Sequence, residues 1–122
     1  MMQAAVAEIA KHSQTLDSVY INSGVMLGFG PIHKVTSADL LENMNANVVG
    51  PHNIFKAFAP MVVASKSEKR SIAVTSSLLG SLGALSQWGP STKKPYGFDD
   101  IPVACYAVSK FVNALFSFVP EK

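Results

Sequence analysis

Two short apolar runs, separated by a long segment with helical periodicity, constrain the fold of this chain more than any other feature. Residues 16 to 21 and 71 to 76 each have the length and apolar content of a buried strand. Between them, Thr36 followed by Asp39 is a capping signal, and it predicts a helix from residue 37 to about residue 65. Two strands joined by one long helix predict a parallel crossover unit within an α/β fold.

The remaining segments give the order of the other elements. Apolar residues at helical spacing predict a first helix over residues 2 to 13, and glycines make residues 24 to 31 a loop. Residues 66 to 70 are polar and turn the chain, residues 77 to 101 form a second loop, and residues 102 to 118 form the last helix, with Pro102 in its first turn. The predicted order is helix, strand, helix, strand, helix, within a single domain.

Polar residues follow both predicted strands. Asn22 comes after the first strand and Ser77 after the second. In a parallel unit these carboxyl ends meet at one edge of the sheet, where open α/β sheets bind their ligands. A serine at the end of a strand is more often a turn cap, and Ser76 and Ser81 are close to Ser77 in the sequence. The pattern alone therefore leaves open which serine serves a site.

Tyr106 and Lys110 lie four residues apart on the last predicted helix. Residues at this spacing share a helix face, so the ammonium can approach the phenol and favour its ionised form. A free phenol ionises only near pH ~10, so such a neighbour would equip Tyr106 for proton transfer at neutral pH. The same spacing also arises by chance in helices, where it means a packed ring beside a solvated amine.

Proline at position 51 conflicts with the long predicted helix. Pro51 has no N–H to donate to the carbonyl four residues earlier, which belongs to Asn47. We therefore expect a free main-chain acceptor at Asn47. The alternative is that Pro51 only kinks a surface helix and that Asn47 faces water.

The composition excludes several classes of protein. Only 15% of the 122 residues are charged, the net charge is +2, and no basic stripe is present for nucleic acid. No run reaches the ~20 apolar residues of a membrane span, and the N-terminus lacks the features of a signal peptide. Cys105 is the single cysteine, while His12, His33 and His52 have no ligand spacing, so we predict neither a disulfide nor a metal site. We expect a soluble, cytoplasmic chain without nucleic-acid or membrane partners.

Four segments occur in a fixed order, and each resembles a motif of the short-chain dehydrogenase/reductase family. They are Asn22-Ser23-Gly24, Asn47-Val48-Val49-Gly50, the strand end Val74-Thr75-Ser76-Ser77, and Tyr106 with Lys110. The resemblance covers nearly the whole chain, although Ile21 and Ser23 replace two letters of the first family motif. It implies a partial Rossmann-type, doubly wound parallel sheet, of which this chain is the central β-α-β-α portion.

The family pattern also shows what this chain lacks. Members are longer and begin with a Gly-x-x-x-Gly-x-Gly turn, whose backbone approaches the cofactor pyrophosphate. Gly24, Gly28 and Gly30 follow the Asn22 turn instead, and we interpret them as loop glycines. The last strands of the family fold are absent too. The resemblance thus implies one NAD(P)-binding domain, residues 1 to 122, truncated at both ends.

The resemblance implies a catalytic role for four residues. Tyr106 would protonate a carbonyl oxygen while a nicotinamide delivers hydride, or would accept the hydroxyl proton in the reverse direction. Lys110 would favour the phenolate and bind the nicotinamide ribose. Ser77 would hydrogen-bond the substrate oxygen, a choice made over Ser76 because the strand end aligns that way. Asn47 would hold a water molecule through its main-chain carbonyl.

The resemblance also implies a cofactor site. Asn22, Ser23 and Gly24 would line the floor under the adenine half of NADP or NAD, and Tyr106 and Lys110 would contact the cofactor as well. Residues 77 to 83 and residues 109 to 113 most resemble the subgroup that contains norsolorinic acid ketoreductase and the C-factor proteins. That likeness favours ketone reduction with NADP, although the segment that selects between NAD and NADP is absent.

Two functions follow from these expectations. The first is an NAD(P)-dependent oxidoreductase that acts on a small carbonyl or alcohol substrate, as a homodimer or homotetramer. The second is a truncated, inactive homologue that serves as a dimerisation partner, because the two long helices are present while the phosphate-binding turn is not. The loop before Tyr106 carries Trp88, Tyr96 and Phe98, which form either an aromatic wall for a bulky substrate or a self-packed loop.

Overall fold

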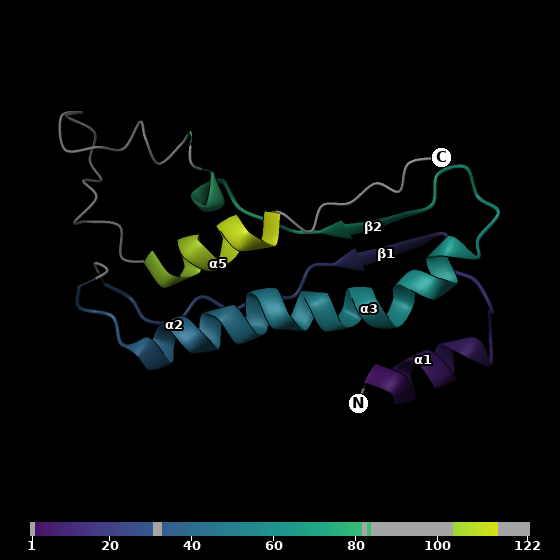
Figure 1. Ribbon diagram of the computed structural model, residues 1–122, viewed down its shortest axis with the longest axis horizontal. Coiled ribbons are helices and arrows are strands. Elements are labelled where there is room, and N and C mark those ends of the chain that lie inside the picture. Colours follow the sequence, from purple (N-terminus) through teal and green to yellow (C-terminus); the bar gives the residue numbers. More distant parts are fainter. Residues whose placement is uncertain (1, 31–32, 82, 84–103, 115–122) are drawn as a thin grey trace.

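The two predicted strands pair in parallel, as the β-α-β order requires (Figure 1). The computed structural model describes residues 2–30, 33–81, 83 and 104–114. In chain order its elements are α1 (Met2–Ala10), β1 (Ser18–Ile21), α2 (Ser37–Met44), η1 (Asn45–Val49), α3 (Gly50–Val63), β2 (Ser71–Val74), η2 (Leu78–Gly80) and α5 (Ala104–Ala114). A small parallel sheet with helices packed on it confirms the predicted partial α/β fold.

The sheet brings the carboxyl ends of both strands to one edge. β1 and β2 pair in register from Ser18 opposite Ser71 to Ile21 opposite Val74. One more backbone bond follows, because the N–H of Thr75 donates to the carbonyl of Ile21 at 2.9 Å. Both strands point toward α5 in Figure 1, so the residues that follow them lie next to that helix.

The hydrophobic core lies between the sheet and α3. Its buried centre is Ile21, Val62 and Ile72, and partly buried apolar side chains surround it: Leu16, Val19, Ile54, Phe55, Ala59 and Val74. Successive side chains of a strand point to opposite faces. Tyr20, between two inward-facing residues, therefore points away from α3 and is 76% exposed.

The elements α2, η1 and α3 follow one another without a break and form the long helix predicted for residues 37 to 65, ending at Val63. The capping signal at its start is confirmed. Thr36 Oγ1 accepts the N–H of Asp39 at 3.1 Å, and the Asp39 carboxylate accepts the N–H of Thr36 at 3.1 Å. This reciprocal pair satisfies backbone donors that the first helical turn cannot satisfy internally.

A π-helical turn, η1, lies within this continuous run and ends two residues before Pro51. Within η1, the N–H of Gly50 donates to the carbonyl of Asn45, five residues earlier instead of four. Pro51 has no N–H, so a regular helix would lack the hydrogen bond from residue 51 to the carbonyl four residues earlier. The wider turn changes the hydrogen-bonding pattern next to this position. Such turns occur often at functional sites. The free main-chain acceptor expected at Asn47 stays a prediction, and the sequence did not specify the π-helical turn.

The loop after β1 is held against the start of α2. Gly28 and Gly30 have positive φ angles of 70° and 146°, a backbone conformation that favours glycine. A Cβ atom on Gly28 would come within 2.5 Å of the Asp39 side chain. Both glycines are thus required by the path of the loop, which supports their interpretation as loop glycines.

Several predicted boundaries differ from the structure by a few residues. α1 ends at Ala10 instead of residue 13, and β2 ends at Val74 instead of residue 76. Trp88, Tyr96, Phe98 and the ends of the last predicted helix lie outside the described residues. Within the described ranges, no helix combines the length and the apolar character needed to cross a membrane.

Candidate functional site

The two strand ends are linked by polar side chains. Thr75, directly after β2, donates its hydroxyl to Oδ1 of Asn22, directly after β1, at 2.7 Å. Asn22 and its neighbours Ser23 and Gly24 are exposed at this edge of the sheet. The predicted cofactor-floor residues therefore lie at the carboxyl edge, and Asn22 also ties the strands together.

Helix α5 is docked on this edge through Lys110. Its Nζ atom donates to the carbonyl of Thr75 at 3.0 Å, and Nδ2 of Asn113 donates to the same carbonyl at 3.2 Å. In return, Oγ of Ser76 donates to the main-chain carbonyl of Lys110 at 3.0 Å. The residues that follow β2 are thus bonded to both the side chain and the backbone of Lys110.

The predicted pairing of Tyr106 with Lys110 is present in the structure. The Lys110 Nζ atom lies 5.5 Å from the centroid of the Tyr106 ring. Lys110 is only 3% exposed, so the alternative of a solvated amine beside a packed ring is wrong. Burial lowers the pKa of the Lys110 ammonium below its ordinary value, because the charged form loses hydration.

The lowered pKa of Lys110 predicts how stability depends on pH. Between the lowered pKa and the ordinary pKa of 10.5, the unfolded chain binds more protons than the folded chain. The free energy of unfolding should therefore rise with pH through this window, since the cost of the buried ammonium is full below it and vanishes above it. Urea unfolding would measure this dependence in the wild type and in Lys110→Met. As pH rises, the free energy of unfolding of the wild type should increase relative to that of Lys110→Met.

The control for this prediction is Lys56→Met, which removes an exposed lysine from α3. An equal pH dependence in the Lys110 and Lys56 variants would contradict the assignment of the effect to the buried amine.

Asn47 is fully buried, and its side chain joins the π-helical turn to the loop after β1. Oδ1 accepts the N–H of Val25 at 2.8 Å, and Nδ2 donates to the carbonyl of Val25 at 2.8 Å. The alternative in which Asn47 faces water is therefore wrong. The sequence pointed to the main-chain carbonyl of Asn47, whose role stays a prediction, and it did not anticipate this use of the side chain.

Ser109 connects Asn47 to the helix that carries Tyr106 and Lys110. It is fully buried, its Oγ atom accepts Nδ2 of Asn47 at 2.8 Å, and it donates to the carbonyl of Tyr106 at 2.7 Å. Sequence reasoning missed this residue. Its spacing of three residues from Tyr106 was the available signal, because residues i and i+3 share a helix face.

Gly24 brings the first motif into contact with the second and the fourth. A Cβ atom on Gly24 would lie 3.1 Å from Oδ1 of Asn47 and 3.2 Å from Nζ of Lys110. The backbone after β1 therefore approaches both side chains closely. The structure brings Gly24, Asn47, Tyr106 and Lys110 together, although they are widely separated in the sequence.

The two serines after β2 have different environments. Ser76 uses its hydroxyl proton for the carbonyl of Lys110, whereas Oγ of Ser77 accepts the N–H of Leu79 and caps η2. Among the described residues, no hydrogen bond joins Ser77 to Tyr106. The occupied hydroxyl of Ser76 favours Ser77 as the substrate-binding serine, which stays a prediction.

Other candidate chemistry is limited in the described part of the chain. Cys105 is fully buried, and burial raises the pKa of its thiol, as expected for a packing cysteine. Within residues 2–30, 33–81, 83 and 104–114, no three His, Cys, Asp or Glu side chains are grouped as ligands for a metal ion.

Comparison with known proteins gives one family. The family model for short chain dehydrogenase matches residues 1–92. An uncharacterized oxidoreductase of Schizosaccharomyces pombe is 33% identical over 93 residues, which cover 76% of this chain and 35% of that protein. The short-chain dehydrogenase srdF of Neurospora crassa is 32% identical over 88 residues, covering 69% of this chain and 35% of that protein. The chain thus spans about a third of the length of these relatives.

Solved structures share the fold. Sniffer of Caenorhabditis elegans, a proposed carbonyl reductase, matches with a TM-score of 0.73 and 22% identity, over 94% of this chain and 49% of that one. A short chain dehydrogenase of Shigella flexneri, solved in complex with NADP, matches with a TM-score of 0.69 and 22% identity, over 91% and 39% of the two chains.

Proposed function

Because this chain belongs to the short-chain dehydrogenase family, we propose that the protein is an NAD(P)-dependent oxidoreductase acting on a ketone or aldehyde, or on the corresponding alcohol. One observation carries the proposal. The Lys110 amine is buried beside the Tyr106 ring at the carboxyl edge of a parallel sheet. This edge is where ligands bind in open α/β folds.

The proposed proton donor is Tyr106. Its hydroxyl protonates the substrate oxygen in reduction and accepts the alcohol proton in oxidation. Lys110, whose Nζ atom lies 5.5 Å from the centroid of the Tyr106 ring, would bind the nicotinamide ribose. Ser77 orients the substrate oxygen toward Tyr106, and the Asn47 carbonyl holds a water molecule. Bound cofactor supplies or accepts the hydride.

The residues present fit a nicotinamide cofactor at this edge. Lys110 has three N–H groups, of which the carbonyl of Thr75 occupies one, so donors remain for ribose hydroxyls. Gly24 lets the backbone after β1 pass close to Lys110, since a Cβ at this position would come within 3.2 Å of Nζ. Asn22 and Ser23 border the same edge. We favour NADP over NAD, because the Shigella flexneri relative in fold was solved with NADP.

The test is cofactor binding by the longest natural form of the protein, since the relatives are about three times as long as the aligned segment. NADPH fluorescence should change on titration, with weaker binding of NADH, and NADPH should be consumed when simple ketones are added. Absence of binding for both nucleotides would contradict the proposal. The cytoplasmic setting expected from the composition stays a prediction.

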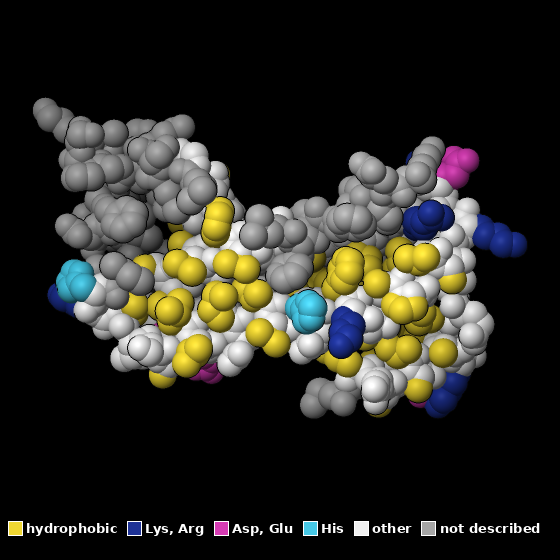
Figure 2. Space-filling view, viewed as in Figure 1, with side chains coloured by type: hydrophobic (Ala, Val, Ile, Leu, Met, Phe, Trp, Pro, Cys, Tyr) yellow, Lys and Arg dark blue, Asp and Glu magenta, His cyan; other side chains and the backbone are white. Residues whose placement is uncertain are grey.

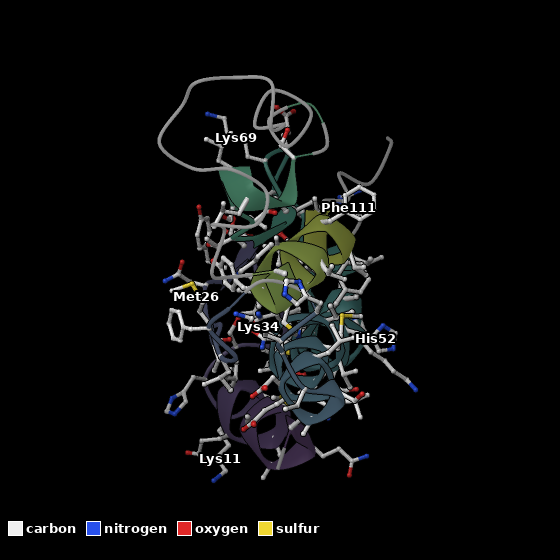
Figure 3. All side chains as sticks on the ribbon, turned by 90° about the vertical axis from the view of Figure 1, so that its left-hand side faces the viewer. Lys11, Met26, Lys34, His52, Lys69 and Phe111 are labelled. Atoms are coloured by element: carbon white, nitrogen blue, oxygen red, sulfur yellow. The ribbon has the colours of Figure 1, made fainter. Side chains whose placement is uncertain are left out.

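The second candidate, a non-catalytic dimerisation partner, is favoured by an exposed apolar surface. Figure 2 shows hydrophobic side chains gathered over the long helical run and α5. On these elements the exposed large hydrophobic side chains are Leu41, Val49, Val63, Val108 and Phe111. Phe111 lies on the same side of the molecule as His52, and Met26 lies on the opposite side (Figure 3).

The oligomeric state tests this candidate. A homodimer or homotetramer by light scattering, without nucleotide binding, would support the partner function, whereas an oligomer that binds NADPH would support the enzyme. Phe111→Ser should weaken the association in either case, because it places a polar group in an apolar contact.

A further inference from the structure

Asn43 makes a second set of bonds to the loop after β1. It is fully buried on α2, accepts the N–H of Leu27 at 3.3 Å through Oδ1, and donates Nδ2 to the carbonyl of Leu27 at 2.9 Å. Nδ2 also donates to the carbonyl of Asp39 at 2.8 Å. Asn43 thus pairs with Leu27 as Asn47 pairs with Val25.

The two pairs form a ladder between a helix and an extended segment. Asn43 and Asn47 are four residues apart, and four residues of a helix rise about 6 Å. Val25 and Leu27 are two residues apart, and two residues of an extended chain span about 6.6 Å. Because these spacings match, each amide side chain bonds both the N–H and the carbonyl of one loop residue, as the backbone of a neighbouring strand would. We call Asn43, Asn47, Val25 and Leu27 the amide ladder.

The ladder leads directly to the proposed site. Gly24 precedes Val25, and its backbone lies against Oδ1 of Asn47 and Nζ of Lys110. At the far end of the loop, the backbone of Gly28 lies against Asp39. The path between these two points depends on Val25 and Leu27, and Asn43 fixes the second of them.

We propose that Asn43 is a positioning residue, which holds the backbone of residues 25 to 27 on α2 and thereby keeps Gly24 against Lys110. This inference rests on the proposed function, in which Lys110 lies beside the cofactor. An amide side chain suits this position, because Leu27 presents both a donor and an acceptor there. Asn43 acts through Gly24 and Lys110 and touches no reacting atom.

The first experiment measures hydrogen exchange by mass spectrometry in the wild type, Asn43→Ala and Asn45→Ala. Asn45 is the matched control, an exposed asparagine on the same helical run. In Asn43→Ala, exchange in a peptide covering residues 25 to 28 should accelerate about tenfold or more, because buried backbone groups lose their partners. Exchange in α3 should stay unchanged, and Asn45→Ala should resemble the wild type.

The second measurement reports on Lys110 without cofactor or turnover. Acetic anhydride modifies neutral, accessible amines, so Lys110 should react far more slowly than the exposed Lys66 in the wild type. In Asn43→Ala, the rate at Lys110 relative to Lys66 should increase, because Gly24 no longer covers the amine. Since neither readout needs NADPH, failure of this inference is separable from failure of the proposed oxidoreductase.

Three results obtained with a folded Asn43→Ala variant would overturn the inference. They are unchanged exchange in residues 25 to 28, accelerated exchange there without a change at Lys110, and uniform acceleration that includes α3. The last result would give Asn43 a general role in stability only. Should Asn43→Ala fail to fold, Asn43→Leu keeps about the same side-chain size, adds no charge and loses the bonds to Leu27, and it should give the same two changes. Failure of both variants to fold would also overturn the positioning role.

Discussion

Replacing Tyr106 by phenylalanine is expected to lower kcat/KM for NADPH-dependent ketone reduction by about a hundredfold to ten-thousandfold. The change removes one hydroxyl and keeps the ring that lies 5.5 Å from Lys110 Nζ. In the proposed mechanism, this hydroxyl delivers the proton that neutralises the developing alkoxide. Steady-state kinetics of the longest natural form of the protein would measure the loss.

A matched control is present in the chain. Tyr20→Phe removes the hydroxyl of a tyrosine that is 76% exposed and points away from α3. This variant should keep full activity, and circular dichroism should show native helix content in both variants. Turnover retained by Tyr106→Phe, with the protein folded, would rule out Tyr106 as the proton donor.

The second large effect is expected at Gly80, where the backbone of η2 meets the backbone of α5. A Cβ on Gly80 would lie 2.6 Å from the carbonyl carbon of Lys110 and 2.7 Å from both the Lys110 oxygen and the Phe111 nitrogen. These are backbone atoms, so no side-chain rotation can relieve the overlap. Gly80→Ala should therefore lower the free energy of unfolding by about 3 kcal/mol, the upper end for overpacking.

The same substitution should reduce activity as well. Separating η2 from α5 moves Ser77, which caps η2, away from Tyr106 and Lys110 on α5. Denaturant unfolding and kinetics would measure the two effects. Gly83→Ala is the control, because among the described residues the nearest atom to its Cβ would be Ser81 Oγ at 3.8 Å, an ordinary contact. Equal destabilisation by both variants would contradict the proposed overlap.

Local patterns account for the parts of the fold and the site that could be predicted from the sequence. The period of apolar residues located both strands and the long helix, and Thr36 with Asp39 marked its start, because capping depends on residues three apart. The four-residue spacing of Tyr106 and Lys110 placed them on one helix face, because residues i and i+4 are neighbours on a helix surface. The order of the four motifs indicated the family, which the comparisons confirmed.

Other features could not be predicted, because they depend on residues far apart in the sequence. The bond between Asn47 and Ser109 spans 62 residues, and the bond between Lys110 and Thr75 spans 35. No local pattern distinguishes an asparagine that bonds a distant loop from one that faces water. The π-helical turn before Pro51 is similar, since proline removes a bond but does not determine how the helix adapts.

The sequence by itself determined the β-α-β order, the parallel edge and the residue types available there, since these follow from periodicity and chain connectivity. Only the tertiary structure decided that Lys110 is buried and that the Ser76 hydroxyl donates to the main-chain carbonyl of Lys110. It also decided that the side chains of Asn43 and Asn47 hold the loop after β1. The physical reason is that burial and hydrogen bonding are properties of the packed elements. They exist only once α5, the strand ends and the loop meet.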